Sequence, residues 1–95
     1  MKFLAIEREA PGVAPDRFQP SLEAEAVRAW ELYQSGLIRE LYFRADRSEA
    51  VLVLECASLE EAQQTLATLP LVREGLIAFE IIPLIPYPGF RRLFR

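Results

Sequence analysis

Acidic side chains interrupt apolar runs at several points of this 95-residue sequence, and they are the first candidates for chemistry. Glu7, Glu40, Glu55 and Glu80 each fall inside a stretch that is otherwise typical of a β-strand. Most such residues point to solvent at strand ends or pair with an arginine. A carboxylate in a half-apolar cleft instead has a raised pKa, which suits it to proton transfer. The sequence leaves both roles open.

Glu25 and Arg39 form the strongest candidate pair. Glu25 falls in the first turn of a predicted helix, beside its apolar stripe, so it either borders a cleft or is an ordinary anion favoured by the helix dipole. Arg39 falls on a predicted strand, where we expect it to share a side with Leu41 and Phe43. A guanidinium in such a row either pairs with a carboxylate of the protein or holds the carboxylate or enolate of a ligand. In an enzyme, Glu25 would be the acid/base and Arg39 the anion holder.

The composition excludes several kinds of site. The sequence has no histidine, which removes the commonest metal ligand, the usual iron ligand of haem and every nucleophile that depends on a histidine base. The single cysteine, Cys56, excludes an intramolecular disulfide and a multi-cysteine metal site, and we expect it to be a small buried hydrophobe. We therefore expect neither a metal nor a cofactor.

Charge is distributed unevenly along the chain. Residues 1–90 contain 8 Lys and Arg against 14 Asp and Glu, whereas Arg91, Arg92 and Arg95 make the last five residues basic. An acidic body repels phosphates, so we expect no nucleic-acid partner. The run from Met1 to Glu9 is too short in apolar residues for a signal peptide, and no apolar run could span a bilayer. These features favour a cytoplasmic protein without membrane contact.

The elements that must position the candidate residues follow from apolar periodicity and from turn residues. We predict strands at 2–8, 37–45, 50–56 and 76–85, a helix from the cap Ser21 to Gly36, a second helix from the capping box Ser58–Glu61 to Pro70, and a loop at 71–75. The core stripe of the first helix is predicted to be Leu22, Ala26, Ala29, Trp30 and Tyr33.

This β-α-β-β-α-β order predicts a ferredoxin-like α+β fold, with both helices on one face of a four-stranded antiparallel sheet. Alternation places Leu52 and Leu54 on one side of their strand and Val51 and Val53 on the other, so the bare face is also apolar. Such a face favours pairing of two copies into a dimeric α+β barrel. The chain is predicted to be one domain, 1–95, with residues 84–95 as a C-terminal extension that crosses to a neighbouring subunit or folds over its own cleft.

A motif pattern connects these elements to a known family. It runs Glu25-x3-Ala-x2-Leu-x3-Gly-x2-Arg39-x-Leu-Tyr42, then Leu54-Glu-x2-Ser and Thr65-Leu-x2-Leu-Pro-Leu71. Over roughly residues 2–88 the chain resembles the muconolactone delta-isomerase family. The resemblance implies dimeric α+β barrels that shift a double bond in an unsaturated lactone acid without a cofactor, with Glu25 as acid/base and Arg39 as anion holder. Glu40 stands where that family has a histidine.

Two functions remain open. One is a cofactor-independent isomerase or lyase acting on a small acidic, partly apolar substrate, with Glu25 and Arg39 catalytic and Trp30, Tyr42 and Glu40 contacting the substrate. The other is a non-catalytic barrel that binds a small apolar ligand or only assembles with itself. In both, the expected protein partner is a second copy of this chain.

Overall fold

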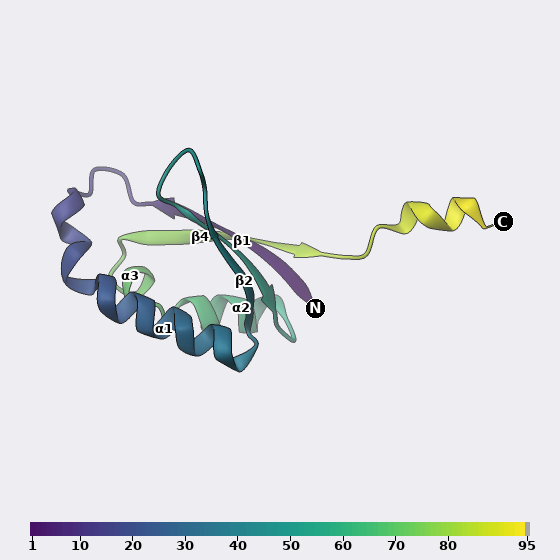
Figure 1. The fold of residues 1–95 in the computed structure, drawn as a ribbon, viewed down its shortest axis with the longest axis horizontal. Helices are drawn as coiled ribbons and strands as arrows, with labels where there is room; N and C mark the ends of the chain where they lie inside the picture. The colour runs from purple at the N-terminus through teal and green to yellow at the C-terminus, as the bar shows by residue number, and fades with distance from the viewer. Residues whose placement is uncertain (95) are drawn as a thin grey trace.

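The computed structural model describes residues 1–94 as a four-stranded antiparallel sheet with its helices on one face (Figure 1). Along the chain lie β1 (Lys2–Glu9), α1 (Leu22–Ser35), β2 (Ile38–Phe43), β3 (Ala50–Glu55), α2 (Leu59–Leu66), the short α3 (Pro70–Arg73) and β4 (Ile77–Leu84). The strand order is β2-β3-β1-β4. This arrangement confirms the predicted ferredoxin-like fold, and β4, which carries Pro83, is an edge strand as expected.

The core lies between the sheet and the helices. Phe3 and Ala5 of β1 and Leu54 of β3 are fully buried there, together with Leu66 of α2. Cys56 is buried against them, as predicted. Alternate residues of the central strands point to the other face, which no described helix covers (Figure 1). That bare face carries half-buried apolar side chains, namely Leu4, Ile6, Val51, Val53 and Ile82.

Helix α1 turns a different face to the sheet from the one predicted. Leu32 is its buried residue, whereas Trp30 and Tyr33 are 58% and 45% exposed and their rings lie 6.0 Å apart. The inward stripe therefore contains Glu25, Ala29 and Leu32, and the prediction that Trp30 and Tyr33 belong to the core was wrong. Helical spacing alone fits both the stripe with Trp30 and Tyr33 and the stripe with Glu25 and Leu32. The aromatic character of Trp30 and Tyr33 favoured the wrong one.

Two local predictions also need correction. The hydroxyl of Ser21 does not cap α1 but donates to the Glu74 carboxylate, at 2.5 and 2.7 Å from its two oxygens. Residues predicted to form a loop after Pro70 instead make α3, and α2 ends earlier, at Leu66. Proline suits the first turn of a helix, where its missing N–H needs no partner, so Pro70 starts a helix rather than only ending one.

A β-bulge changes the direction of Arg39. The pairing of β2 with β3 shifts between Ile38, opposite Leu54, and Glu40, opposite Val53, which leaves Arg39 as the extra residue. Arg39 is exposed and its Nε donates to the Gly36 carbonyl at 2.6 Å. The prediction that Arg39 shares a side with Leu41 and Phe43 was therefore wrong, because strict alternation fails at a bulge.

The chain ends in an arm that stands off the body (Figure 1). After β4, residues 85–94 lead into a 3-10 helix at Pro88–Leu93, and the molecule measures 57 × 28 × 21 Å along its principal axes. Arg95, the last residue of the predicted extension, lies outside the described residues. Among residues 1–94, no helix has the length and apolar character that crossing a membrane requires.

The cap of α2 offers a direct check of the fold. The Ser58 hydroxyl accepts from the Glu61 amide at 3.1 Å, as the capping box predicted, whereas the Glu61 carboxylate accepts from the Ala57 amide at 3.0 Å and not, as expected, from the Ser58 amide. We expect Ser58→Ala to cost about 1 kcal/mol, because the amide loses its partner. In a chain of this size that lowers Tm by about 4–8 °C at fixed protein concentration. Ser48→Ala, in the exposed β2–β3 turn, should leave Tm unchanged; equal losses in both variants would contradict the capping role.

Candidate active site

An apolar cavity of about 290 Å³ lies between α1 and the sheet. Its walls come from α1, β2, β3 and the segment around α3, and they are almost entirely aliphatic or aromatic. The lining residues are Leu22, Ala26, Ala29, Ile38, Leu41, Phe43, Ala50, Leu52, Leu69, Leu71 and Phe79, with the two carboxylates of Glu7 and Glu25. An apolar chamber with a few convergent polar groups is the usual form of a small-molecule site.

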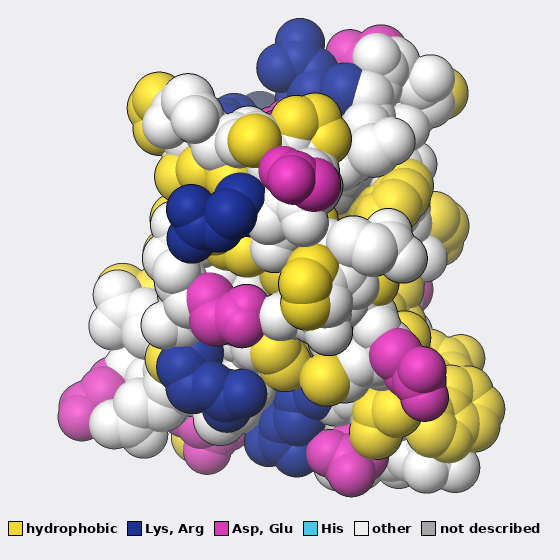
Figure 2. Space-filling view, turned by 90° about the vertical axis from the view of Figure 1, so that its left-hand side faces the viewer, with side chains coloured by type: hydrophobic (Ala, Val, Ile, Leu, Met, Phe, Trp, Pro, Cys, Tyr) yellow, Lys and Arg dark blue, Asp and Glu magenta, His cyan; other side chains and the backbone are white. Residues whose placement is uncertain are grey.

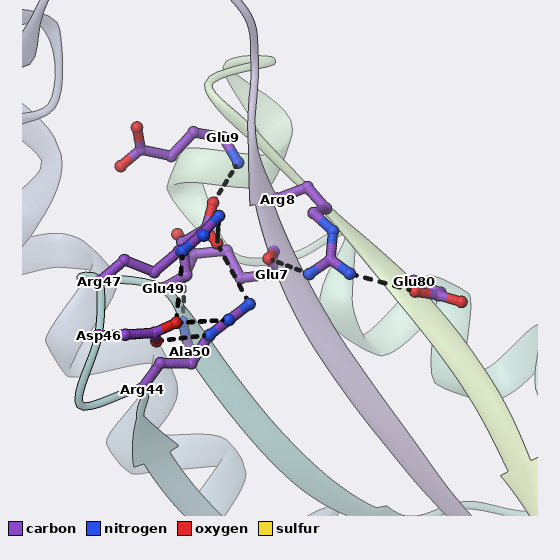
Figure 3. Close-up of polar contacts among 9 residues, drawn as sticks. All are labelled: Glu7, Arg8, Glu9, Arg44, Asp46, Arg47, Glu49, Ala50 and Glu80. Carbon is purple, nitrogen blue, oxygen red and sulfur yellow. Dashed lines mark hydrogen bonds and ion pairs between the residues drawn. The ribbon is translucent and has the colours of Figure 1, made fainter.

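Glu7 enters the cavity from β1, two residues beyond the buried Ala5 on the same side of the strand. The residue is only 7% exposed. The pairing of β1 with β3 ends at Ile6 opposite Val51, and the Glu7 carboxylate accepts the next β3 amide, that of Ala50, at 3.0 Å (Figure 3). The Glu7 side chain therefore supplies the hydrogen-bond acceptor at the point where the backbone pairing of β1 with β3 ends. Its carboxylate lies in the otherwise apolar wall of the cavity.

Glu25 reaches the same cavity from the inward stripe of α1. Its carboxylate accepts from the Leu71 amide at 2.9 Å. That donor is free because Leu71 lies in the first turn of α3, where amides have no partner within the helix. One hydrogen bond thus ties α1 to the segment that closes the cavity from the other side.

Burial governs the acidity of both groups. Desolvation raises the pKa of Glu7 and of Glu25 above the ordinary 4.5, and the hydrogen bonds from Ala50 and Leu71 offset part of that rise. The negative charges of Glu49, Glu9 and Glu25 raise the pKa of Glu7 further. Two carboxylates that share one apolar chamber and repel each other therefore hold protons more readily than surface carboxylates do.

A cluster of charges fastens the β2–β3 turn beside Glu7 (Figure 3). Glu49 is 8% exposed, and its carboxylate accepts from the Glu9 amide at 3.1 Å. Arg44 and Arg47 approach the other Glu49 oxygen at 4.0 and 3.8 Å, and Arg44 also pairs with Asp46 at 2.7 Å. These contacts hold the start of β3, and with it the Ala50 amide, over the cavity.

The other predicted site residues lie elsewhere. Arg39 is folded over Gly36, while Trp30 is exposed on α1. The N-terminal ammonium, which donates to Glu55, lowers the pKa of that carboxylate, and the charge of Arg39 lowers it further. The Tyr42 hydroxyl donates to Glu40 at 2.7 Å on an exposed part of β2, which raises the pKa of Tyr42. Of the five residues, the structure brings only Glu25 to the cavity. The catalytic and substrate-binding roles assigned to them stay predictions.

Glu7 is the residue that sequence reasoning left out of the site. The signal was present, since Phe3, Ala5 and Glu7 alternate on one side of the strand and the first two are core residues. No Lys or Arg among residues 1–94 lines the cavity. Within the same residues, no group of three or more potential ligands is placed to hold a metal ion.

Comparison with known proteins agrees with this geometry. The family model for muconolactone delta-isomerase matches residues 1–89. The chain belongs to the muconolactone delta-isomerase family. This confirms the resemblance stated from the sequence, and the match covers the cavity, both carboxylates and residues 85–89 of the arm.

Two solved structures share the fold of this family member. A crystal structure of muconolactone isomerase is 24% identical, with a TM-score of 0.76 over 94% of this chain and 93% of that chain. The 5-chloro-2-hydroxyhydroquinone dehydrochlorinase TftG from Burkholderia phenoliruptrix AC1100, in complex with 2,5-dihydroxybenzoquinone, is 18% identical, with a TM-score of 0.64 over 94% and 98%. No curated protein matches the chain.

The raised pKa of Glu7 makes stability depend on pH. The folded protein binds this proton more tightly than the unfolded chain does, so the free energy of unfolding falls as pH rises above 4.5. Glu7→Gln removes that penalty and keeps an oxygen for the Ala50 amide. We expect the Tm of Glu7→Gln relative to wild type to increase between pH 4 and pH 8, as measured by calorimetry. A constant difference for Glu7→Gln over this range would contradict the burial effect.

Proposed function

We propose that this chain catalyses a cofactor-independent proton shift on a small unsaturated lactone or a related conjugated carbonyl compound. The observation that carries the proposal is a pair of carboxylates, the buried Glu7 and the half-buried Glu25, facing one apolar cavity. Membership of the muconolactone delta-isomerase family supports the same reaction class. A volume of about 290 Å³ suits a small molecule at the lower end of ordinary ligand sites.

The proposed reaction needs only these two groups. An ionised carboxylate takes a proton from the carbon at the far end of the conjugated system, γ to the carbonyl, and the electrons of that C–H bond form a dienolate. The other carboxyl, in its protonated form, gives its proton to the carbon next to the carbonyl as the double bond moves. The substrate and product are isomers, and the two carboxyls have exchanged protonation states. Proton exchange with water then restores the starting state.

Burial and charge prepare Glu7 to hold its proton. Desolvation is the largest cause of its raised pKa, and the charges of Glu49, Glu9 and Glu25 raise that pKa further, so ionised Glu25 favours the protonated form of Glu7. A pair of titratable groups whose environments keep one proton between them supplies both a base and an acid. We assign the role of base to Glu25, which lies near Leu22, an exposed residue of the cavity lining. We assign the role of acid to Glu7, which is more deeply buried.

The bare face of the sheet supports self-association. Leu4, Ile6, Val51 and Val53 form an apolar surface on the central strands, opposite the helices. We propose that a second copy covers this face, which gives a dimeric α+β barrel. The end of the molecule away from the arm differs, since acidic, basic and hydrophobic side chains are interspersed there (Figure 2). This mixed surface is unlike the basic stripe typical of nucleic-acid binders.

Self-association can be tested on the sheet face. We expect light scattering to give a mass of at least twice 10.9 kDa for the wild type. Val53→Glu should shift the mass toward that of one chain, because a charge in an apolar interface loses its hydration. Glu60→Lys, on the exposed side of α2, serves as the charge-changing control and should keep the wild-type mass. A wild-type protein that is monomeric at micromolar concentration would rule out the barrel.

The catalytic proposal is tested by proton exchange. Unsaturated lactones and their acids are incubated with the protein in D2O, and NMR records deuterium uptake and double-bond migration. For a substrate that turns over, we expect Glu25→Gln to lower the rate by about 10²–10⁴-fold, because the amide keeps the shape but lacks the basicity. Glu23→Gln, two residues away on an exposed part of α1, should retain the wild-type rate.

The same experiment distinguishes the alternative function. A compound that raises Tm without exchanging a proton would indicate a non-catalytic barrel that only binds a ligand. Equal turnover by wild type and Glu25→Gln would remove Glu25 from the proton transfer. In that case the Glu7→Gln variant shows whether the other carboxylate performs it.

A further inference from the structure

The polar lining of the cavity consists of acceptors that carry negative charge. Its charged groups are the carboxylates of Glu7 and Glu25, set in walls that are otherwise aliphatic or aromatic. One oxygen of each carboxylate accepts from a backbone amide, that of Ala50 for Glu7 and that of Leu71 for Glu25. Within residues 1–94, no protein donor reaches the second oxygen of either group. Each carboxylate therefore keeps an oxygen that can accept from a bound molecule.

The charges around Glu7 add to the negative character of this wall. Desolvation is the largest cause of the raised pKa of Glu7, and the carboxylates of Glu49 and Glu9 are among the charges that raise it further. The neighbouring guanidiniums of Arg44 and Arg47 are turned to Glu49, whose carboxylate they approach at 4.0 and 3.8 Å (Figure 3). The positive charge of the β2–β3 turn is therefore matched inside the turn and does not reach the cavity.

The charges around Glu25 lie outside the cavity. Glu74 and Arg73 follow each other at the end of α3, and both are exposed. Arg73 lines a groove on the outer side of α1, together with Arg28 and Thr68, rather than the cavity itself. Glu25 therefore faces the apolar chamber as a carboxylate without a paired cation on that side.

This electrostatic arrangement restricts the charge of a ligand. A charged group that enters an apolar cavity loses its hydration, and only opposite charges or hydrogen-bond donors compensate for the loss. A ligand carboxylate in this cavity would instead meet two protein carboxylates, and repulsion between like charges is strong where water is excluded. An uncharged ligand avoids both costs, and the aliphatic and aromatic walls bury its ring.

We propose that Glu7 and Glu25 select an uncharged substrate, namely a neutral unsaturated lactone or conjugated carbonyl compound. This class differs from the lactone acid that the family resemblance implies. A hydroxyl or an amide N–H on the ligand donates to the second oxygen of either carboxylate, and the carbonyl-bearing ring fills the apolar part of the cavity. The inference rests on the proposed function for the location of its site, and it adds the charge of the substrate.

A matched pair of ligands tests this charge selection. One is a saturated γ-lactone with a carboxymethyl substituent, and the other is its primary amide, which has nearly the same shape without the charge. Because the rings are saturated, neither ligand can undergo the proposed double-bond shift, and only binding is measured. NMR titration at pH 8, where the free acid is ionised, gives both dissociation constants. We expect the amide to bind at least about tenfold more tightly than the acid.

Two results of this titration would overturn the proposal. Equal or tighter binding of the acid would show that a cation reaches the cavity and neutralises its lining. A lack of binding by the amide would show that the cavity does not receive an uncharged lactone.

Variants that remove one charge assign the selection to the carboxylates. Glu7→Gln keeps an oxygen for the Ala50 amide, and we expect the preference for the amide ligand to fall by about threefold or more. Glu25→Gln should reduce the preference in the same way. Glu60→Gln, an exposed position on α2 outside the cavity lining, removes an equal charge from the protein and should leave the preference unchanged. An unchanged preference in both cavity variants would refute the role of Glu7 and Glu25.

Turnover of the unsaturated counterparts separates this inference from the proposed function. If the amide binds selectively but its unsaturated form takes up no deuterium and does not isomerise, the charge selection stands and the catalytic proposal fails. If the unsaturated acid binds more tightly and isomerises faster than the unsaturated amide, the catalytic proposal stands and the charge selection is wrong.

Discussion

The placement of two carboxylates, the buried Glu7 and the half-buried Glu25, in one apolar chamber is the constraint on which the rest of the structure depends. A buried carboxylate is tolerated only where hydrogen bonds replace part of its hydration. Glu7 obtains this from the Ala50 amide and Glu25 from the Leu71 amide. Both donors are amides with no place in the regular hydrogen-bond pattern around them, one where the β1–β3 ladder ends and one in the first turn of α3. The hydrogen bonds to the two carboxylates thus come from backbone amides at the ends of a strand and a helix, where those amides have no partner within the element.

This requirement explains features away from the cavity. The β2–β3 turn must hold the Ala50 amide in place. The hydrogen bond from the Glu9 amide to Glu49 fastens that turn to the end of β1, and Arg44 and Arg47 pair with Glu49 inside the turn. At the opposite wall, the Ser21 hydroxyl bonds to Glu74 just after α3, which joins the start of α1 to the segment that presents Leu71. Each carboxylate is therefore supported by a second layer of polar contacts, and loss of that layer would leave a charge without its donor.

The sequence predicted the architecture well, because alternation in strands and the capping box at Ser58 are local signals that the tertiary structure preserves. It predicted the site less well. The inward direction of Glu25 was left open because two overlapping stripes on α1 fit helical spacing, and packing against the sheet selects the one that ends at Leu32. The direction of Arg39 depends on a bulge, which a pattern of period two does not reveal. The Leu71 amide could not be foreseen either, since the short helix that frees it was predicted as a loop.

The absence of histidine gives the buried pair its significance. Without a side chain that ordinarily titrates near neutral pH, a protein that moves protons must shift a carboxyl group toward that range, and desolvation is the direct means. Water in the cavity would weaken both the desolvation and the repulsion between Glu7 and Glu25. The mouth beside Phe43 is uncovered in a single chain, so the perturbed acidity is strongest when something apolar closes it.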